Sequence, residues 1–273
     1  MALPRPRKDS LELLNEVLEE RKAGRNSRFF EGIADEWEDR VRAYIDSVGS
    51  PALVADWPEI DTHRTKFLNL YSGARDGSAQ KSVLVEMRRE HGLSLCPSCG
   101  EAGTPNTLDH YLPKDGFPHF SVTPLNLFPM CDACQLAKGT KTGDDDEPKF
   151  FLHPYFDVFV AERVLELSIE PPFESPNFQL GIRPGLAPDE EALVASHVRE
   201  LDIAARYNKF LKGQHSRMLK LANQIRESGQ DLRGSLETFA AMSGFVAENA
   251  WEHVYYRAVL DCDECIEFMR ARD

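Results

Sequence analysis

Two Cys-x-x-Cys pairs constrain the folding of this chain more than any other feature of its sequence. Cys96 and Cys99 form the first pair, and Cys131 and Cys134 form the second after an interval of 31 residues. A short turn of this kind directs both sulfur atoms to one side, so two turns together complete a tetrahedral shell of four thiolates. We therefore predict one Zn²⁺ ion held by these four cysteines. Because protein ligands fill all four positions, the ion is expected to stabilise the fold and to bind no substrate.

The composition is typical of a folded cytoplasmic protein. The 273 residues are 42% hydrophobic and 10% aromatic, which is enough for a buried core. No apolar run approaches the roughly 20 residues of a membrane helix, and no apolar signal segment follows the basic start MALPRPRK. We expect a cytoplasmic protein with no membrane partner. In that compartment the six cysteines are expected to bind metal or to remain free thiols rather than form disulfides.

Hydrophobic periodicity divides the chain into three regions. Residues 1–92 follow the spacing of amphipathic helices, and residues 93–156 consist of short segments interrupted by Pro, Gly and the cysteine pairs. Residues 157–273 are expected to form a β-hairpin followed by helices. We predict an α+β fold that is mainly helical, with a small zinc-stabilised module flanked by two helical regions.

The segment between the cysteine pairs carries residues suited to phosphodiester hydrolysis. An unperturbed histidine titrates near neutral pH, so we expect His110 to act as a base toward water, and Asp109 offers a hard oxygen ligand for Mg²⁺ or Mn²⁺. Neighbouring residues of a strand point to opposite faces, so both side chains can serve one site only at a strand end or a bulge. Pro113 follows closely and is consistent with such an end.

With these residues in this order, the segment from Cys96 to Tyr155 resembles the HNH endonucleases, ββα-metal nucleases with a four-cysteine zinc site. The resemblance implies an enzyme that cleaves phosphodiester bonds, with DNA as the expected substrate, and a role in bacterial restriction or phage defence. It also implies that Asn126 holds the loop that carries His110. The alternative is a zinc-stabilised module that binds nucleic acid or protein and has lost catalysis.

The sequence departs from the family pattern at Gln135, where the family has a metal-binding His or Asn. A glutamine carbonyl can bind a hard cation, but its longer side chain loses more rotamer freedom when it does so. His153 either replaces Gln135 or contacts a phosphate, or else it simply packs near Pro154. Lys138 and Lys141 are candidate phosphate contacts, although exposed lysines are ordinarily only solubilising.

The longest predicted helix, from Ile203 to Arg226, carries a basic stripe. The candidate contacts to DNA on it are Arg206, Lys209, Arg217 and Lys220. Such a stripe suits phosphates, but an ordinary solvated helix face has the same pattern. The net charge of −13 opposes binding to a polyanion, so we predict weak binding by the isolated chain. A protein partner or a second copy is then expected to present the DNA, and the acidic tail after Asp231 either docks that partner or packs within the chain.

A further cysteine pair, Cys262 and Cys265, lies in a helical pattern and has no visible partner pair. Residues three apart share one helix face, so the two thiols either form half of a site at a dimer contact or belong to the core or surface. The second interpretation is favoured.

Overall fold

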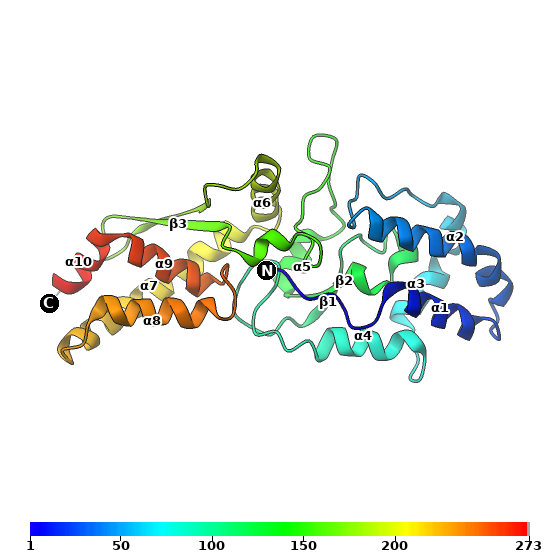
Figure 1. The fold of residues 1–273 in the computed structure, drawn as a ribbon, viewed down its shortest axis with the longest axis horizontal. Helices are drawn as coiled ribbons and strands as arrows, with labels where there is room; N and C mark the ends of the chain where they lie inside the picture. The colour runs from blue at the N-terminus through cyan, green and yellow to red at the C-terminus, as the bar shows by residue number, and fades with distance from the viewer. Residues whose placement is uncertain (272–273) are drawn as a thin grey trace. The chain divides into compact units, whose positions relative to one another are not determined.

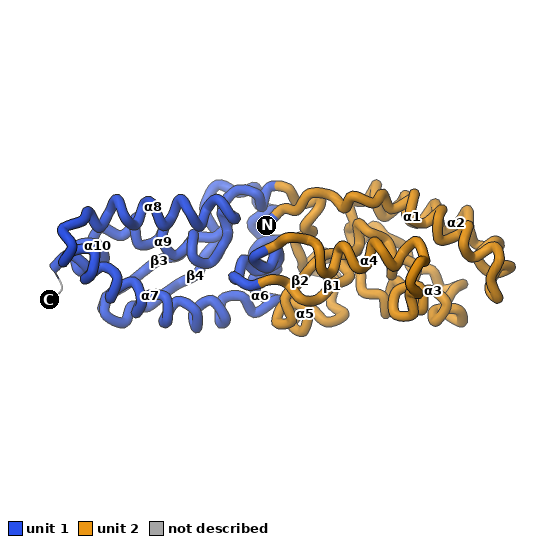
Figure 2. The backbone as a smooth tube through the Cα atoms, turned by 90° about the horizontal axis from the view of Figure 1, so that it is seen from below, with its two compact units in different colours: residues 1, 94–103, 159–273 blue, residues 2–93, 104–158 orange. Residues whose placement is uncertain are grey.

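The computed structural model describes residues 1–271. Its contacts divide the chain into two compact units, which Figure 2 shows in different colours. Unit 1 contains residue 1, residues 94–103 and the chain from Phe159 onward, and unit 2 contains residues 2–93 and 104–158. The fold is mainly helical with two small two-stranded sheets, which confirms the predicted α+β class. The three-region organisation stays a prediction.

Unit 2 contains helices from both sides of the first cysteine pair in the sequence, and these helices are labelled in Figure 1. Its helices are α1 (Ser10–Arg21), α2 (Ser27–Asp46), α3 (Arg64–Ser72), α4 (Ala79–Arg89) and α5 (Asp132–Lys138). Its strands are β1 (Thr107–His110) and β2 (Leu127–Met130), and its 3-10 turns are η1 (Pro58–His63), η2 (Pro118–Phe120) and η3 (Pro124–Asn126). Helix α1 begins where the Asp9 carboxylate accepts hydrogen bonds from the N–H groups of Leu11 and Glu12, a standard N-cap.

The two strands and the following helix are in the order ββα, as the sequence predicts. Strands β1 and β2 are antiparallel, and His110 pairs with Leu127 at the end of β1. Leu84 of α4 packs with Leu108 and Leu127 in a small apolar core beneath this sheet. The core fixes the sheet against α4, so the last residues of β1 have a firm support.

The loop between β1 and β2 is anchored to the N-terminal helices. The Trp37 indole N–H donates a hydrogen bond of 2.8 Å to the carbonyl of His119, and the Ser121 hydroxyl donates one of 3.0 Å to the carbonyl of Phe67. The rings of Trp37 and Phe67 meet edge to face with their centroids 5.0 Å apart. Buried aromatic rings and backbone hydrogen bonds together hold this loop in place.

Unit 1 is a helical assembly with one β-hairpin. After the 3-10 turn η4 (Val158–Ala161) come β3 (Leu165–Glu170), β4 (Asn177–Ile182), α6 (Pro188–Glu200), α7 (Ile203–Glu227), α8 (Leu232–Gly244), α9 (Trp251–Asp261) and α10 (Asp263–Ala271). The antiparallel pairing of β3 with β4 confirms the predicted hairpin. Alternate side chains of β3 are buried, because one face of the hairpin packs against α9 while the other meets solvent.

Within the described residues, no helix combines the length and apolar character that crossing a membrane would require.

Candidate metal centre and active site

The four cysteines of the two pairs form a cluster suited to a metal ion. The sulfur atoms of Cys96, Cys99, Cys131 and Cys134 all lie within 4.8 Å of one another, and three of these residues are buried. Four thiolates around zinc, each at about 2.3 Å, lie about 3.8 Å apart at the corners of a tetrahedron. The spacing therefore fits a zinc ion held by all four residues, and we call this group the cysteine cluster.

The first cysteine pair is held by a tight turn within unit 1. The N–H of Gly100 donates to the carbonyl of Cys96 at 2.8 Å, and the backbone φ of Gly100 is +78°. A Cβ atom at this position would lie 2.2 Å from the carbonyl oxygen of Asn249, so only glycine fits. The Trp251 indole N–H donates to the carbonyl of Cys99 at 2.6 Å and locks the turn onto α9.

Arg206 of the predicted basic stripe faces this turn. Its guanidinium lies 3.1 Å from the Glu101 carboxylate and 3.8 Å from the Cys99 sulfur. A cation beside a thiolate stabilises the ionised sulfur that a metal requires. Lys209, Arg217 and Lys220 are exposed on α7, and Arg217 donates a hydrogen bond to the Gln214 side chain.

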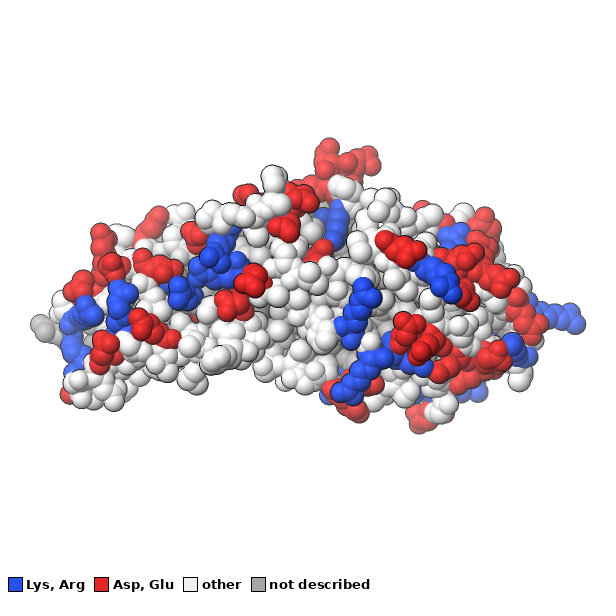
Figure 3. Space-filling view, in the orientation of Figure 1, with Lys and Arg blue, Asp and Glu red and all other residues white. Residues whose placement is uncertain are grey.

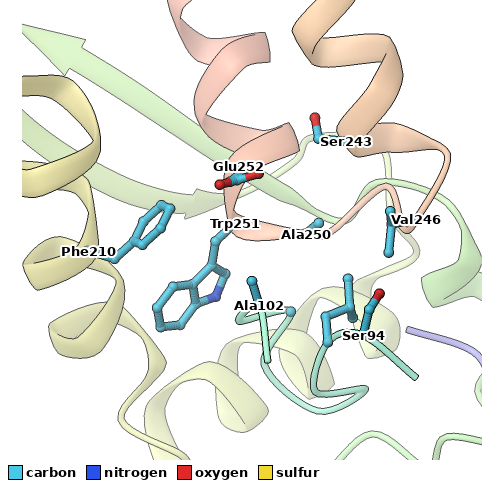
Figure 4. A pocket seen from close by; sticks show the side chains of 10 residues that line it. Ser94, Ala102, Phe210, Ser243, Val246, Ala250, Trp251 and Glu252 are labelled. Carbon is cyan, nitrogen blue, oxygen red and sulfur yellow. The ribbon is translucent and has the colours of Figure 1, made fainter. Parts of the chain in front are cut away.

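A pocket of about 250 Å³ lies beside the same turn in unit 1 (Figure 4). Its lining is mostly apolar, with the rings of Phe210 and Trp251 and the small side chain of Ala102 labelled in the figure. Glu252 is the charged residue among those that line it. Ser94 and Ser243 are the other polar side chains of a lining that is otherwise apolar.

Asp109 and His110 are the last two residues of β1 in unit 2. The Asp109 Oδ1 atom accepts a hydrogen bond of 3.2 Å from Gln135 Nε2, and its Oδ2 atom lies 3.1 Å from the Lys138 ammonium. The Oδ2 atom is buried, and apart from this ion pair it has no hydrogen-bond partner. Gln135 and Lys138 thus contact the Asp109 carboxylate, and Lys138 also contacts the backbone carbonyl of His110. We call Asp109, His110, Gln135 and Lys138 the His110 site.

His110 is held as a neutral imidazole with one nitrogen free. Its Nε2 atom lies 3.0 Å from the carbonyl oxygen of Ser121, and a carbonyl only accepts, so Nε2 carries the proton. The other nitrogen, Nδ1, therefore has a lone pair. Burial lowers the pKa of His110 from 6.5 to about 3, the bond to Ser121 offsets part of this effect, and the charges of Lys114, Lys138 and Arg88 lower the pKa further. At neutral pH the ring is therefore unprotonated, and the lowered pKa makes it a weaker base than a solvent-exposed histidine.

Asn126 is fully buried and joins segments of the loop after β1. Its side-chain oxygen accepts from the N–H of Leu112 at 2.8 Å, and its amide nitrogen donates to the carbonyls of Leu112 and Phe120 at 3.0 and 3.2 Å. The backbone N–H of Tyr111 donates to the Asn126 carbonyl at 2.7 Å. These bonds fix the backbone immediately after His110.

Lys138 lies in the interior, with only 1% of its surface exposed. Its ammonium donates to the His110 carbonyl at 2.7 Å and pairs with Asp109. Burial lowers the pKa of Lys138 from its usual 10.5, while the Asp109 carboxylate acts in the opposite direction. The side chain therefore neutralises Asp109 from inside the protein. Lys141, three residues on, is half-buried.

His153 is enclosed by aromatic side chains. Its Nε2 atom lies 2.9 Å from the Tyr44 hydroxyl, and its ring lies 4.2 Å from that of Tyr111 and 4.4 Å from that of Phe156. Burial lowers the pKa of His153 well below 6.5. Of the three roles weighed from the sequence, these contacts match packing. Asp157, which accepts from the His153 backbone N–H, completes this setting.

Three residues of the His110 surroundings have no sequence signature. Tyr71 and Arg88 lie on α3 and α4, ahead of the first cysteine pair, and Ser121 lies in the loop between the strands. The Tyr71 ring meets the His110 ring with centroids 4.6 Å apart. Only tertiary packing brings these residues to His110, so no motif could have identified them.

The cysteine pair near the C-terminus, Cys262 and Cys265, lies outside any such cluster. Among the described residues, Cys262 and Cys265 belong to no group of three or more ligands close enough to hold a metal. Cys265 is fully buried, and burial raises the pKa of its thiol to about 12.

Comparison with known proteins finds one partial relative. No family model matches this chain, and no solved structure matches it either. The protein ea31 of Escherichia phage lambda is 39% identical over 70 residues, a stretch that covers 25% of this chain and 24% of the phage protein. The chain is thus similar to about a quarter of the length of a phage protein.

Proposed function

We propose that this protein is a zinc-stabilised, metal-dependent HNH endonuclease that hydrolyses phosphodiester bonds, most readily in DNA. The observation that carries the proposal is the neutral His110 at the end of β1, one residue after Asp109, with its Nδ1 lone pair free. The ββα order of the surrounding elements and the cysteine cluster support it further.

In the proposed reaction His110 is the general base. A water molecule attacks phosphorus while one of its protons passes to Nδ1 of His110, and the bond from phosphorus to the leaving oxygen breaks. The N–H of Nε2, held by the Ser121 carbonyl, fixes the ring and stabilises the imidazolium that forms. The leaving oxygen takes a proton from solvent.

Asp109 and Gln135 would hold the catalytic divalent cation. The buried Oδ2 atom of Asp109, which accepts no hydrogen bond, and the amide oxygen of Gln135 are hard ligands of the kind that Mg²⁺ and Mn²⁺ prefer. When bound, such a cation neutralises charge on the phosphate. The amide nitrogen of Gln135 faces Asp109 Oδ1, so the amide also orients the carboxylate.

One contact favours the alternative, a binding module without catalysis. The ammonium of Lys138 is 3.1 Å from Asp109 Oδ2 and already supplies a positive charge there. A divalent cation must compete with this internal charge, which weakens its binding. Loss of cation binding would leave a zinc-stabilised module that contacts nucleic acid or a protein.

A plasmid-nicking assay decides between the two functions. The purified, zinc-loaded protein should nick supercoiled DNA with Mg²⁺ or Mn²⁺, and His110→Ala should reduce the rate by about 10²–10⁴-fold, the usual contribution of a general base. The matched control is His91→Ala, because His91 also places Nε2 against a backbone carbonyl, that of Pro105, at 3.1 Å. Binding of DNA without metal-dependent nicking would support the alternative instead.

The proposed setting is the conflict between bacteria and phages, as the resemblance to HNH nucleases implies. With Asp and Glu side chains spread over the face shown in Figure 3 and a net charge of −13, the isolated chain should bind DNA weakly. We therefore propose a protein partner or a second copy of the chain in the active assembly.

A further inference from the structure

A chain of hydrogen bonds links α4 to the residue that precedes Asp109. Arg88 Nη2 donates to the Tyr71 hydroxyl at 2.7 Å, and that hydroxyl donates to the carbonyl of Leu108 at 2.9 Å. The same Tyr71 ring lies against His110, with centroids 4.6 Å apart. Tyr71 therefore contacts the His110 ring and the Arg88 guanidinium at once, and it fixes where the guanidinium lies relative to the base.

Arg88 and Lys114 are less buried than Lys138, the third cation whose charge acts on His110. Lys138 is buried and paired with Asp109, whereas Arg88 is exposed in the last turn of α4 and Lys114 is half-buried in the loop after β1. Within the described part of the chain, no carboxylate forms an ion pair with Arg88 or with Lys114. Both have charges close enough to act on His110.

The Arg88 guanidinium is exposed and is bonded to Tyr71, whose ring lies against the buried His110. A guanidinium is planar and has several N–H donors that match the oxygens of a phosphate. Tyr71 engages one terminal nitrogen of Arg88 and leaves the other donors for a ligand.

We propose that Arg88, positioned by Tyr71, binds a phosphate group of the nucleic acid beside His110. This inference rests on the proposed nuclease function and names the side chains that hold the substrate at that site. The principal phosphate contact is then Arg88 on α4 rather than the buried Lys138.

The test measures binding apart from cleavage. In the His110→Ala protein, which should not cut, affinity for a short fluorescent duplex DNA is measured by anisotropy between about 20 and 200 mM salt. Adding Arg88→Gln should weaken binding about tenfold at low salt and reduce the slope of log affinity against log salt by about one, as expected for one lost phosphate contact.

Arg89→Gln is the matched control. Arg89 follows Arg88 on the same helix and is also exposed, so Arg89→Gln changes the net charge by the same amount as Arg88→Gln. The Arg89 side chain, however, points about 100° away around the helix axis. It should change affinity by less than about twofold. Equal effects of the two substitutions, no effect of Arg88→Gln, or no binding by the parent at low salt would each overturn the inference.

Tyr71→Phe tests the positioning role in the cleaving protein. It keeps the ring against His110 and removes the hydroxyl that orients Arg88, so KM should rise about threefold with little change in kcat. An unchanged KM would remove Tyr71 from the inference. If His110→Ala instead cleaves as fast as the wild type, the proposed function fails, whatever the contrast between Arg88 and Arg89 shows.

Discussion

The cysteine cluster and the His110 site are both groups of potential metal ligands, but they differ in how completely their atoms are used. The cluster has four soft thiolates within 4.8 Å, enough to surround one ion. The His110 site has a hard carboxylate that is paired with the Lys138 ammonium and an imidazole whose Nδ1 has a free lone pair. A saturated shell stabilises a fold, whereas an unsaturated one is available for chemistry.

The largest effect should come from breaking the cysteine cluster. Cys131→Ser removes one thiolate, so zinc should fall from one ion per chain to a small fraction and the module should unfold, because the binding energy of a structural zinc is folding energy of about 10 kcal/mol or more. Elemental analysis and thermal denaturation measure both. Cys262→Ser, outside the cluster, is the control and should retain one zinc. A Cys131→Ser protein with an unchanged melting temperature would refute a stabilising role.

Acid should destabilise the protein by two routes, protonation of the cysteine thiolates and protonation of buried histidines. A substitution of His119 tests the second route. His119 is 1% exposed, neither ring nitrogen has a partner, and burial lowers its pKa from 6.5 to about 3. The unfolded chain takes up a proton near pH 6.5 that the folded chain refuses until about pH 3. The free energy of unfolding is therefore unaffected above pH 6.5 and falls by up to about 1.4 kcal/mol per pH unit below it.

His119→Phe should remove this contribution while leaving the cysteine cluster intact. The phenylalanine ring takes the place of the His119 ring, whose centroid lies 5.3 Å from that of Trp57 and 4.0 Å from that of Phe120. Urea denaturation at pH 7, 6 and 5 with excess zinc should show a shallower loss of stability in the variant. Parallel curves for variant and wild type would assign the acid sensitivity to the thiolates and the other histidines.

The smallest effect concerns Gln135 at the edge of the His110 site. Gln135→Ala removes the hydrogen bond to Asp109 Oδ1 and a candidate ligand, so about tenfold more Mg²⁺ or Mn²⁺ should be needed for half-maximal nicking. Gln135→Asn and Gln135→His should preserve or increase activity. An unchanged metal requirement in Gln135→Ala would leave Asp109 as the ligand that matters, and the zinc content should be the same in all three variants.

Features that depend on local spacing were predicted well. The cysteine cluster follows from two short turns, and the β3–β4 hairpin follows from alternating apolar residues. Helix α7 was expected to end at Arg226 and ends at Glu227. Each of these features repeats within a few residues, so its pattern is visible in the sequence.

The sequence by itself determined the helical character of the chain, the paired turns of the cysteine cluster and the position of Asp109 and His110 between them. Only the tertiary structure decided that Lys138 is buried against Asp109, that His153 lies among aromatic rings, and that Tyr71 links Arg88 to the surroundings of His110. Burial and ion pairing depend on which distant segments meet in the folded chain. Two lysines with the same local sequence pattern can therefore end at the surface or in the core, and a local pattern contains no record of that choice.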